Sequence, residues 1–229
     1  MRNLKRGKQI FVIGISVTLG LNFFLVLPAL ARAELLSELI AKAQENYEKT
    51  EDLKARFIQE VTIKSMDRME REEGFFYFKK PMSMLWDYVK PKTKKIVINQ
   101  QKACLYIPED HVLYVQDVES IFKSRPAIKL FSGIGKLQKD FQISFSQPDP
   151  LDRDGNYLLT LVPRDSVFGI KKLFLTIDRG NFQILQCSFT DIYGNVTCIR
   201  FREIRVNNKL SARLFTFKPP PGVEVVNVP

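Results

Sequence analysis

The spacing of apolar residues changes about fifty residues into the chain. Between residues 36 and 47 the apolar side chains recur every three or four positions, which predicts an amphipathic helix over residues 34–50. Over residues 53–64 apolar and polar side chains alternate, as in an antiparallel strand with one buried face. Shorter strand-like runs follow, separated by proline, glycine and aspartate. They cover residues 74–78, 82–88, 94–99, 103–107, 112–118, 141–147, 157–162, 171–178, 182–190, 196–205 and 213–217.

Two short turns connect consecutive strands near the end of this series. Asp178-Arg179-Gly180-Asn181 and Asp191-Ile192-Tyr193-Gly194-Asn195 have the composition of hairpin turns, and we expect each glycine to take the left-handed conformation. About eleven successive strands after one helix predict a single, highly curved antiparallel sheet. A barrel or half-barrel hides the edges of such a sheet. The fold class we expect is therefore mainly β with α, an unclosed (half) antiparallel β-barrel with an N-terminal helix.

One segment interrupts the strands. Between residues 119 and 140 the apolar residues have helical spacing, although Gly133 and Gly135 weaken such a helix. One interpretation is a short, irregular crossover helix that covers one end of the sheet. The other is a movable lid over an apolar cavity, extending from about residue 126 to residue 139. The candidate lid residues are Leu130, Phe131 and Ile134.

The N-terminus has the three-part layout of a secretory signal peptide. A basic start is followed by an apolar run over residues 10–30 and by the small-residue site Ala31-Arg32-Ala33. The run is long enough to cross a bilayer as a retained anchor, but Pro28 and the small residues favour cleavage. We therefore expect a signal peptide over residues 1–33 and one soluble domain over residues 34–229, working outside the cytoplasm. Residue 34 is a glutamate, so the expected new N-terminus has no thiol for a lipid anchor.

The chain is poorly supplied with catalytic side chains. Its single histidine, His111, lies in a turn-like stretch, and the three cysteines are not spaced as in a zinc site. No G-x-S-x-G motif is present, and Gly133 and Gly135 lack the context of a dinucleotide site. The formal net charge of +10 falls to +5 without the five basic residues of the signal peptide, and the remaining basic residues are scattered, unlike a nucleic-acid-binding face. We expect a binding protein with no catalytic residue, metal, cofactor or nucleic-acid partner.

Large apolar side chains are abundant, with 18 Phe, 7 Tyr and 5 Met. The strand period of two places the alternate residues from 82 to 88 on one face, and the strand before it carries aromatic side chains on both faces. Each of these side chains alone fits an ordinary core. Together, on one concave sheet, they favour a cavity for a greasy ligand such as an acyl chain, because methionine repacks around different guests. The candidate cavity residues are Phe57, Phe76, Phe78, Met82, Met84, Trp86 and Tyr88.

The chain resembles the family of periplasmic carriers of outer-membrane lipoproteins, LolA, over essentially the whole predicted mature chain. The matching stretches are a helix followed by Phe57-Ile58-Gln59, then GFFYFKKP at 74–81, LWDY at 85–88 with Pro91, the turn at 191–195, and FTFKPPPGV at 215–223. The resemblance implies an unclosed antiparallel barrel whose apolar cavity is covered by short helices. It also implies a periplasmic carrier that takes acylated lipoproteins from an inner-membrane ABC transporter complex to an outer-membrane lipoprotein receptor. We expect the carrier to be a monomer.

One position departs from the family pattern. The resemblance implies an arginine directly before Pro81 that holds the helical lid closed by hydrogen bonds, and here this residue is Lys80. A lysine has three donors but no planar fork, so it binds carbonyl groups with less geometric constraint. Lys80 is therefore either a looser lid latch or an ordinary solvated lysine.

Two further function classes compete with the carrier. A periplasmic sensor or regulatory module with the same half-barrel would bind a lipid or a peptide as a signal, and it would usually have a second domain. A hydrolase of lipids or envelope polymers is the other class. A carboxylate pair for glycoside hydrolysis has no positive support in the sequence.

The redox state of the cysteines depends on one hairpin. Cys187 and Cys198 flank the turn at residues 191–195 and oppose each other only if the loop has an even number of residues. An odd loop places them on different faces and excludes a disulfide between them. The alternatives are thus a disulfide that leaves Cys104 free, or three buried thiols that act as small apolar residues.

Overall fold

The structure is a computed structural model that describes residues 23–119, 137–164 and 170–228. The chain divides into two compact units, Met1–Ser37 and Glu38–Pro229. Helix α1 (Phe23–Lys49) begins in the first unit and ends in the second. It starts at residue 23, whereas the predicted helix begins at residue 34. None of the helices in the described ranges combines the length and the apolar character that a membrane crossing requires.

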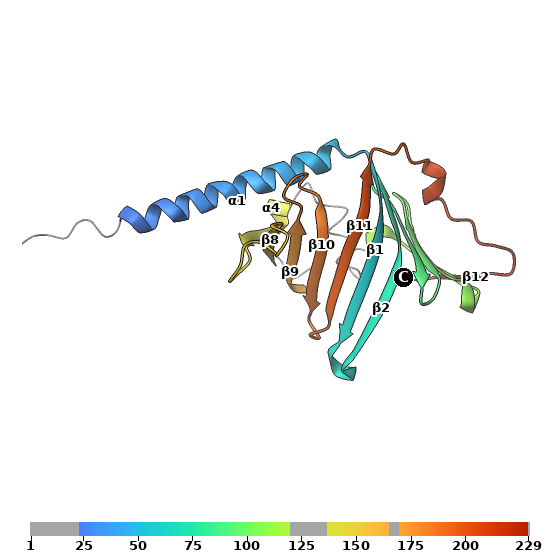
Figure 1. Ribbon diagram of the computed structural model, residues 1–229. Coiled ribbons are helices and arrows are strands. Elements are labelled where there is room, and N and C mark those ends of the chain that lie inside the picture. The colour runs from blue at the N-terminus through green and yellow to red at the C-terminus, as the bar shows by residue number, and fades with distance from the viewer. Residues whose placement is uncertain (1–22, 120–136, 165–169, 229) are drawn as a thin grey trace, which may run out of the picture. The chain divides into compact units, whose positions relative to one another are not determined.

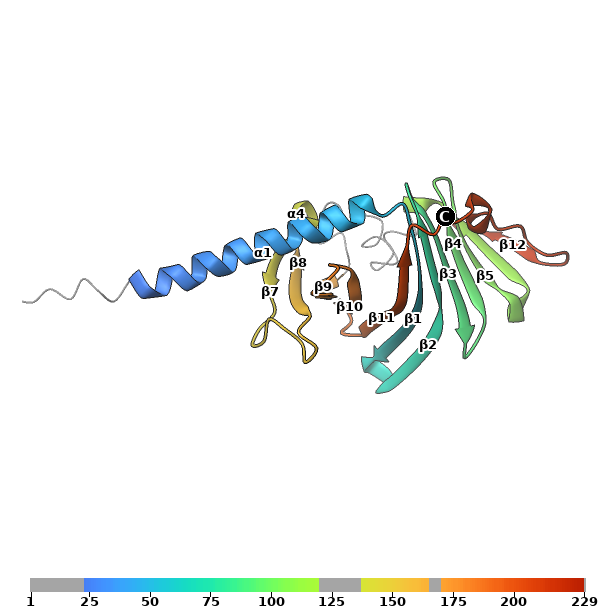
Figure 2. The same cartoon turned by 45° about the horizontal axis from the view of Figure 1, so that its top comes forward.

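The second unit contains one sheet of twelve strands in the order β12-β6-β5-β4-β3-β2-β1-β11-β10-β9-β8-β7. Neighbouring strands are antiparallel except β12, which pairs with β6 in parallel. Figures 1 and 2 show that the strands form a single curved layer. The strands are β1 (Asp52–Ile63), β2 (Arg68–Lys79), β3 (Ser83–Lys90), β4 (Lys94–Ile98), β5 (Ala103–Ile107), β6 (Val112–Gln116), β7 (Phe141–Phe145), β8 (Tyr157–Pro163), β9 (Ile170–Ile177), β10 (Ile184–Asp191), β11 (Val196–Val206) and β12 (Glu224–Asn227).

The predicted fold class, mainly β with an open antiparallel sheet, is confirmed. The two outer strands of the sheet, β12 and β7, do not pair with each other, so the sheet is not closed. The remaining regular elements in the described ranges are short: helix α4 (Leu137–Asp140) and the 3₁₀ turns η1 (Lys64–Met66), η2 (Pro108–Asp110) and η5 (Ala212–Phe215). Of the predicted lid, residues 137–139 lie in α4, whereas Leu130, Phe131 and Ile134 lie outside the described residues.

The strand predicted at 213–217 is wrong. The chain forms η5 there, because the Ser211 hydroxyl caps the turn by accepting a hydrogen bond from Arg213 N at 3.3 Å. The turn brings Phe215 into a small core on the outer face of the sheet, against Leu85 and Val97. The chain then continues to β12, a strand that the sequence pattern does not reveal since its four residues are mostly exposed.

The turn between β10 and β11 settles the cysteine pairing. Thr190 pairs with Val196, which leaves five residues in the loop, and Gly194 takes the expected left-handed φ of +87°. With an odd loop Cys187 pairs with Ile199 rather than with Cys198. The two cysteines therefore point to different faces of the hairpin, and all three thiols are free.

The inner face of the sheet carries the larger core. Phe57, Trp86 and Met84 are almost completely buried there. Room for the Phe57 ring depends on Gly74, which pairs with it on the neighbouring strand: a Cβ atom at position 74 would lie 2.8 Å from the ring and 2.2 Å from the carbonyl oxygen of Asp87. The glycine therefore lets an aromatic ring and a neighbouring backbone approach closely.

Candidate functional site

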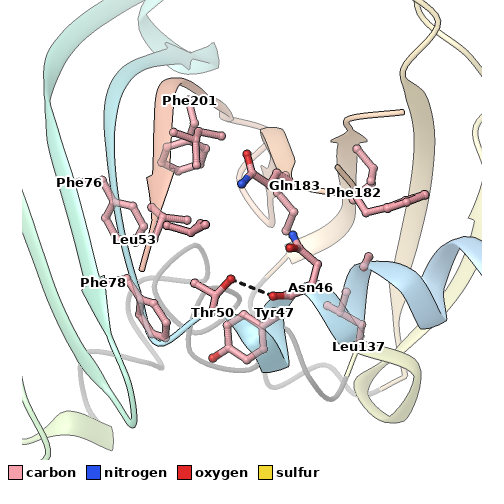
Figure 3. Close-up of a pocket in the computed structure, with 15 residues that line it drawn as sticks. Asn46, Tyr47, Thr50, Leu53, Phe76, Phe78, Leu137, Phe182, Gln183 and Phe201 are labelled. Carbon is pink, nitrogen blue, oxygen red and sulfur yellow. Dashed lines mark hydrogen bonds between the residues drawn. The ribbon is translucent and has the colours of Figure 1, made fainter. Parts of the chain in front are cut away.

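An apolar pocket lies in the second unit, between the last turns of α1 and the inner face of the sheet (Figure 3). Its cavity volume is about 70 Å³, roughly half of an apolar cavity of about 150 Å³ that accepts benzene. The pocket is lined by Ala43, Asn46, Tyr47, Thr50, Leu53, Phe76, Phe78, Leu137, Ile177, Phe182, Gln183, Ile184, Phe201, Ile204 and Val206.

The helical wall is one face of α1. Ala43 lies three and four positions before Asn46 and Tyr47, and Thr50, directly after the helix, lies four and three positions beyond them, which places all four on the same side. Thr50 holds the last turn together, since its backbone N–H donates to the Tyr47 carbonyl at 3.1 Å and its hydroxyl to the Asn46 carbonyl at 2.8 Å. Burial raises the pKa of the Tyr47 phenol above its ordinary value. This wall thus combines an aromatic ring with one amide side chain.

The sheet wall consists of large side chains from three neighbouring strands. Leu53 on β1 pairs directly with Phe78 on β2, and Phe201 on β11 completes the row beside them. The rings of Phe78 and Tyr47 contact across the pocket, with centroids 5.8 Å apart. Helix and sheet are therefore joined by aromatic packing at the pocket itself.

The candidate cavity residues divide into two groups. Phe76 and Phe78 line the pocket. Phe57, Met84, Trp86 and Tyr88 lie in the packed core beside it, on the same face of the sheet, and the Trp86 ring centroid is 4.4 Å from that of Phe76 and 5.1 Å from that of Phe57. Met82 is half-buried in the turn before β3. The structure thus brings the aromatic residues into one cluster, of which the pocket contacts only the edge.

A third wall comes from the turn between β9 and β10, whose residues the sequence pattern did not indicate as part of the site. Phe182, Gln183 and Ile184 are consecutive, yet all three line the pocket. Successive residues of an extended strand point to opposite faces. Phe182 breaks this alternation because its φ is +59°, a left-handed conformation that is rare for a bulky residue. The glycine expected to be left-handed in this turn, Gly180, is not, so that expectation is wrong.

Lys80 contacts the end of α1. Its ammonium donates to the carbonyl oxygen of Glu48, its backbone N–H donates to the Glu51 carbonyl at 2.9 Å, and its side-chain nitrogen lies 5.5 Å from the centroid of the Tyr47 ring. The last carbonyls of a helix have no partner within the helix, and a positive charge is favourable beside them. Lys80 therefore fastens the helical wall to β2, whereas a contact with residues 126–136 falls outside the described residues.

One ionisable group near the pocket, Asp52, has a structural role. Asp52 is 2% exposed and accepts hydrogen bonds from the backbone N–H of Leu210 at 2.9 Å and of Asn208 at 2.6 Å. Burial alone raises the pKa of this carboxyl, but the hydrogen bonds outweigh it and the pKa is lowered. Across the described ranges, no group of three or more His, Cys, Asp or Glu side chains is arranged to hold a metal ion. The pocket therefore offers apolar contact and a few amide groups rather than acid–base chemistry.

Comparison with known proteins agrees with this architecture. Residues 48–218 match a family model described as outer membrane lipoprotein carrier protein LolA. The chain is 28% identical over 208 residues to the outer-membrane lipoprotein carrier protein of Dechloromonas aromatica, covering 91% of this chain and 95% of that protein. It is 30% identical over 174 residues to the protein of the same name from Methylococcus capsulatus, covering 76% and 80%.

A solved structure has a similar fold. The crystal structure of an uncharacterized conserved protein from Thermus thermophilus aligns with a TM-score of 0.55 at 15% identity, covering 84% of this chain and 98% of that one. At this identity the likeness concerns the fold alone.

Proposed function

We propose that this chain, which belongs to the LolA family of outer-membrane lipoprotein carrier proteins, binds the acyl chains of lipoproteins in the pocket between α1 and the sheet. The observation that carries the proposal is the pocket itself: aromatic and aliphatic side chains from α1, β1, β2 and β11 converge on one space, and its described lining residues include no carboxyl, imidazole, amine or thiol group. Such a surface suits a hydrocarbon chain and has little to offer a sugar or an ion.

The energetics favour a carrier whose pocket opens for its cargo. Burying one methylene group contributes about 0.8 kcal/mol, so an acyl chain of many methylenes does not leave a membrane without a replacement surface. A cavity of about 70 Å³ is too small for such a chain. The lining side chains therefore separate when cargo enters, and their contacts with one another re-form when it leaves. This competition allows release without an energy source in the compartment.

The remaining elements of the proposal concern the route. We propose that residues 1–33 direct export, that residues 34–229 work in the periplasm, and that cargo passes from an inner-membrane ABC transporter complex to an outer-membrane receptor. A monomer is sufficient, since the pocket is built from one chain. Residues 126–139 act as the lid, with Leu130, Phe131 and Ile134 against the cargo, and Lys80 holds the helical wall in place.

A release assay tests the carrier function directly. Inner-membrane vesicles carrying a radiolabelled lipoprotein and its transporter are incubated with the purified protein and ATP, and the lipoprotein in the soluble fraction is measured. We expect a soluble one-to-one complex that passes its cargo to outer-membrane vesicles. No soluble lipoprotein above the protein-free background would reject the proposal.

A matched pair of substitutions assigns the activity to the pocket. Ile184→Asp places a charge in the pocket lining, whereas Ile192→Asp makes the same change at the tip of the next hairpin, where the side chain is 60% exposed. We expect Ile184→Asp to abolish soluble complex formation and Ile192→Asp to leave it intact. Equal activity of the two variants would place the cargo elsewhere.

A further inference from the structure

The pocket contains two side-chain amides among its apolar groups. Asn46 is on the pocket-facing side of α1, and Gln183 follows the left-handed Phe182 in the turn between β9 and β10. Figure 3 shows both amides directed into the space between the helix and the strands, on walls that face each other. Since they come from elements more than 130 residues apart in the sequence, their meeting is a product of the fold.

The turn is constructed so that Gln183 faces inward. The carboxylate of Asp178 accepts hydrogen bonds from the N–H groups of Gly180 and Asn181, both at 2.8 Å, and Asn181 Oδ1 accepts from Gln183 N at 2.9 Å. The chain then turns at the left-handed Phe182, which allows residues 182 and 183 to line the pocket together. Three side-chain hydrogen bonds and one unusual backbone conformation thus fix the direction of one glutamine.

The side-chain amides of Asn46 and Gln183 have unused hydrogen-bond donors and acceptors among the described residues. Each side chain offers two N–H donors and a carbonyl acceptor. Among the described residues, no hydrogen bond of either amide group is found, although the backbone carbonyl of Asn46 and the backbone groups of Gln183 are used. Both side chains are partly exposed and so are accessible to water.

A ligand that fills the pocket changes this situation. A hydrocarbon chain expels the water without replacing its hydrogen bonds, and a buried amide without a partner is costly. A chain that ends in an ester supplies carbonyl oxygens, which accept hydrogen bonds from amide N–H groups. A site with polar groups of this kind strongly rejects analogues that lack the matching group.

We infer that Asn46 and Gln183 recognise the ester carbonyl groups of an acylated ligand, and so determine which lipids the pocket accepts. This inference rests on the proposed function, because it names the part of the acyl ligand that the pocket reads. The hydrocarbon lies against Phe76, Phe78 and Phe201, and the two amides bind the carbonyl groups at its head. Ether-linked or unfunctionalised chains of equal length bind more weakly.

Two synthetic lipopeptides test the inference. Both have the same sequence and an N-terminal cysteine that carries a glyceryl group with two sixteen-carbon chains, joined by esters in one peptide and by ethers in the other. Affinity is measured from the emission of Trp86, the single tryptophan of the chain. We expect wild type to prefer the ester by about tenfold or more, the effect of one or two buried hydrogen bonds.

Substitution of the amides should remove this preference. Asn46→Leu and Gln183→Met keep the approximate side-chain volume and remove the donors, and Gln142→Met makes the same change at an exposed site on β7. We expect ester-to-ether ratios near one for the two pocket variants and the wild-type ratio for Gln142→Met. If a pocket variant loses its folded Trp86 emission, Asn46→Ala or Gln183→Ala replaces it.

The outcomes separate the inference from the proposed function. Binding of neither lipopeptide to wild type would reject the carrier proposal, whereas binding of both with a ratio that the pocket variants do not change would reject only the role of the amides. The same comparison is made between dihexanoyl phosphatidylglycerol, which has ester bonds, and its dihexyl ether analogue. It shows whether the site recognises the ester groups of phospholipids as well as those of lipoproteins. A preference in both ligand pairs would mean that the site reads any acyl ester, and one confined to the lipopeptides would assign it to lipoproteins.

Discussion

Phe76 and Trp86 lie directly opposite each other on β2 and β3, and their ring centroids are 4.4 Å apart. Phe76 lines the pocket, whereas Trp86 lies behind it in the core and also contacts the ring of Phe201, at 6.1 Å, which lines the pocket as well. The tryptophan is therefore separated from the pocket by one side chain. Its environment depends on how the two phenylalanine rings are placed.

We predict that a lipid-like ligand changes the emission of Trp86 although it does not touch the indole ring. Filling the pocket displaces Phe76 and Phe201, which alters the packing and polarity around Trp86. Titration with the ester lipopeptide, followed by fluorescence, measures the change. Phe76→Leu should reduce it at saturating ligand, while Phe75→Leu on the outer face should not. An identical emission spectrum of wild type with and without saturating ligand would contradict the binding of the ligand in this pocket.

The close approach at Gly74 gives a stability prediction. In Gly74→Ala the new Cβ atom would lie 2.2 Å from the Asp87 carbonyl oxygen, so strands β2 and β3 must move apart. We expect a loss of about 2 kcal/mol or more in the free energy of unfolding, typical of overpacking in a core. Gly180→Ala is the control, since its nearest atom is at 3.4 Å and its φ is not positive. Urea denaturation of both variants measures the difference, and equal midpoints would contradict the argument.

Asp52 should make the stability depend on pH. Its pKa is lowered in the folded protein, because hydrogen bonds from Leu210 and Asn208 outweigh the effect of burial. A carboxyl with a lowered pKa contributes stability above its unfolded pKa of about 4, and this contribution is lost as the pH falls below that value. Asp52→Asn should cost about 1–3 kcal/mol at pH 7, since the amide replaces one of the two accepting oxygens by a donor and leaves the other uncharged, opposite partly buried N–H groups.

The pH dependence distinguishes the charge from the packing at this site. The difference in unfolding free energy between wild type and Asp52→Asn should shrink as the pH falls from about 5 to about 2. Asp149→Asn, at an exposed position, is the control and should show no such trend. A difference that stays constant over this range would mean that the Asp52 charge contributes nothing.

The cysteines should remain as thiols even under oxidising conditions. Cys187 pairs with Ile199, so it cannot reach Cys198, and burial raises the pKa of the Cys187 thiol, which lowers its reactivity. Alkylation in denaturant without reductant should modify three thiols per chain by mass spectrometry. In the native protein the half-buried Cys198 should react before Cys187. A single alkylated thiol, with a mass lower by two hydrogens, would show that a disulfide forms.

The regular strands could be predicted because their pairing follows from local alternation. β1 and β11 were predicted within one residue of their observed ends. Where burial depends on distant partners, the prediction failed. Phe215 is buried in an outer-face core that contains Leu85, and residues 212–215 form a 3₁₀ turn instead of the strand predicted at 213–217.

The site could be predicted only in part from the sequence, because some of its residues are brought together by distant parts of the chain. Phe76 and Phe78 stand in an aromatic strand, and their alternation reveals a common face. The sequence pattern indicates that Asn46 is an ordinary polar residue of an amphipathic helix and that Gln183 is part of a strand. Only the left-handed Phe182, which local composition does not predict, directs Gln183 into the pocket. A pocket wall made by a turn depends on backbone geometry rather than on hydrophobic period.

Lipid release should depend on the contact of Lys80 with α1. The ammonium satisfies the Glu48 carbonyl at the helix end and lies near the Tyr47 ring, so it holds the wall that carries Asn46 and Tyr47. Lys80→Leu removes the charge and the hydrogen bond, which destabilises the closed pocket, with the α1 wall packed against the sheet, by about 0.5–1.5 kcal/mol. This change should favour cargo uptake but slow cargo release. Lys80→Arg offers a forked donor with more hydrogen bonds and should release cargo as fast as wild type or faster.

The quantity that checks this prediction is the fraction of carrier that retains lipoprotein after incubation with acceptor membranes that contain the receptor. We expect retention to rise in the order Lys80→Arg, wild type, Lys80→Leu, because a weaker closed state competes less well with the bound acyl chains. Lys171→Leu, the same change at an exposed position on β9, should behave as wild type. Since closure and cargo exclude each other in the pocket, a change in closure must appear in retention. Equal retention by wild type and both Lys80 variants would therefore show that the contact of Lys80 with α1 has no part in cargo release.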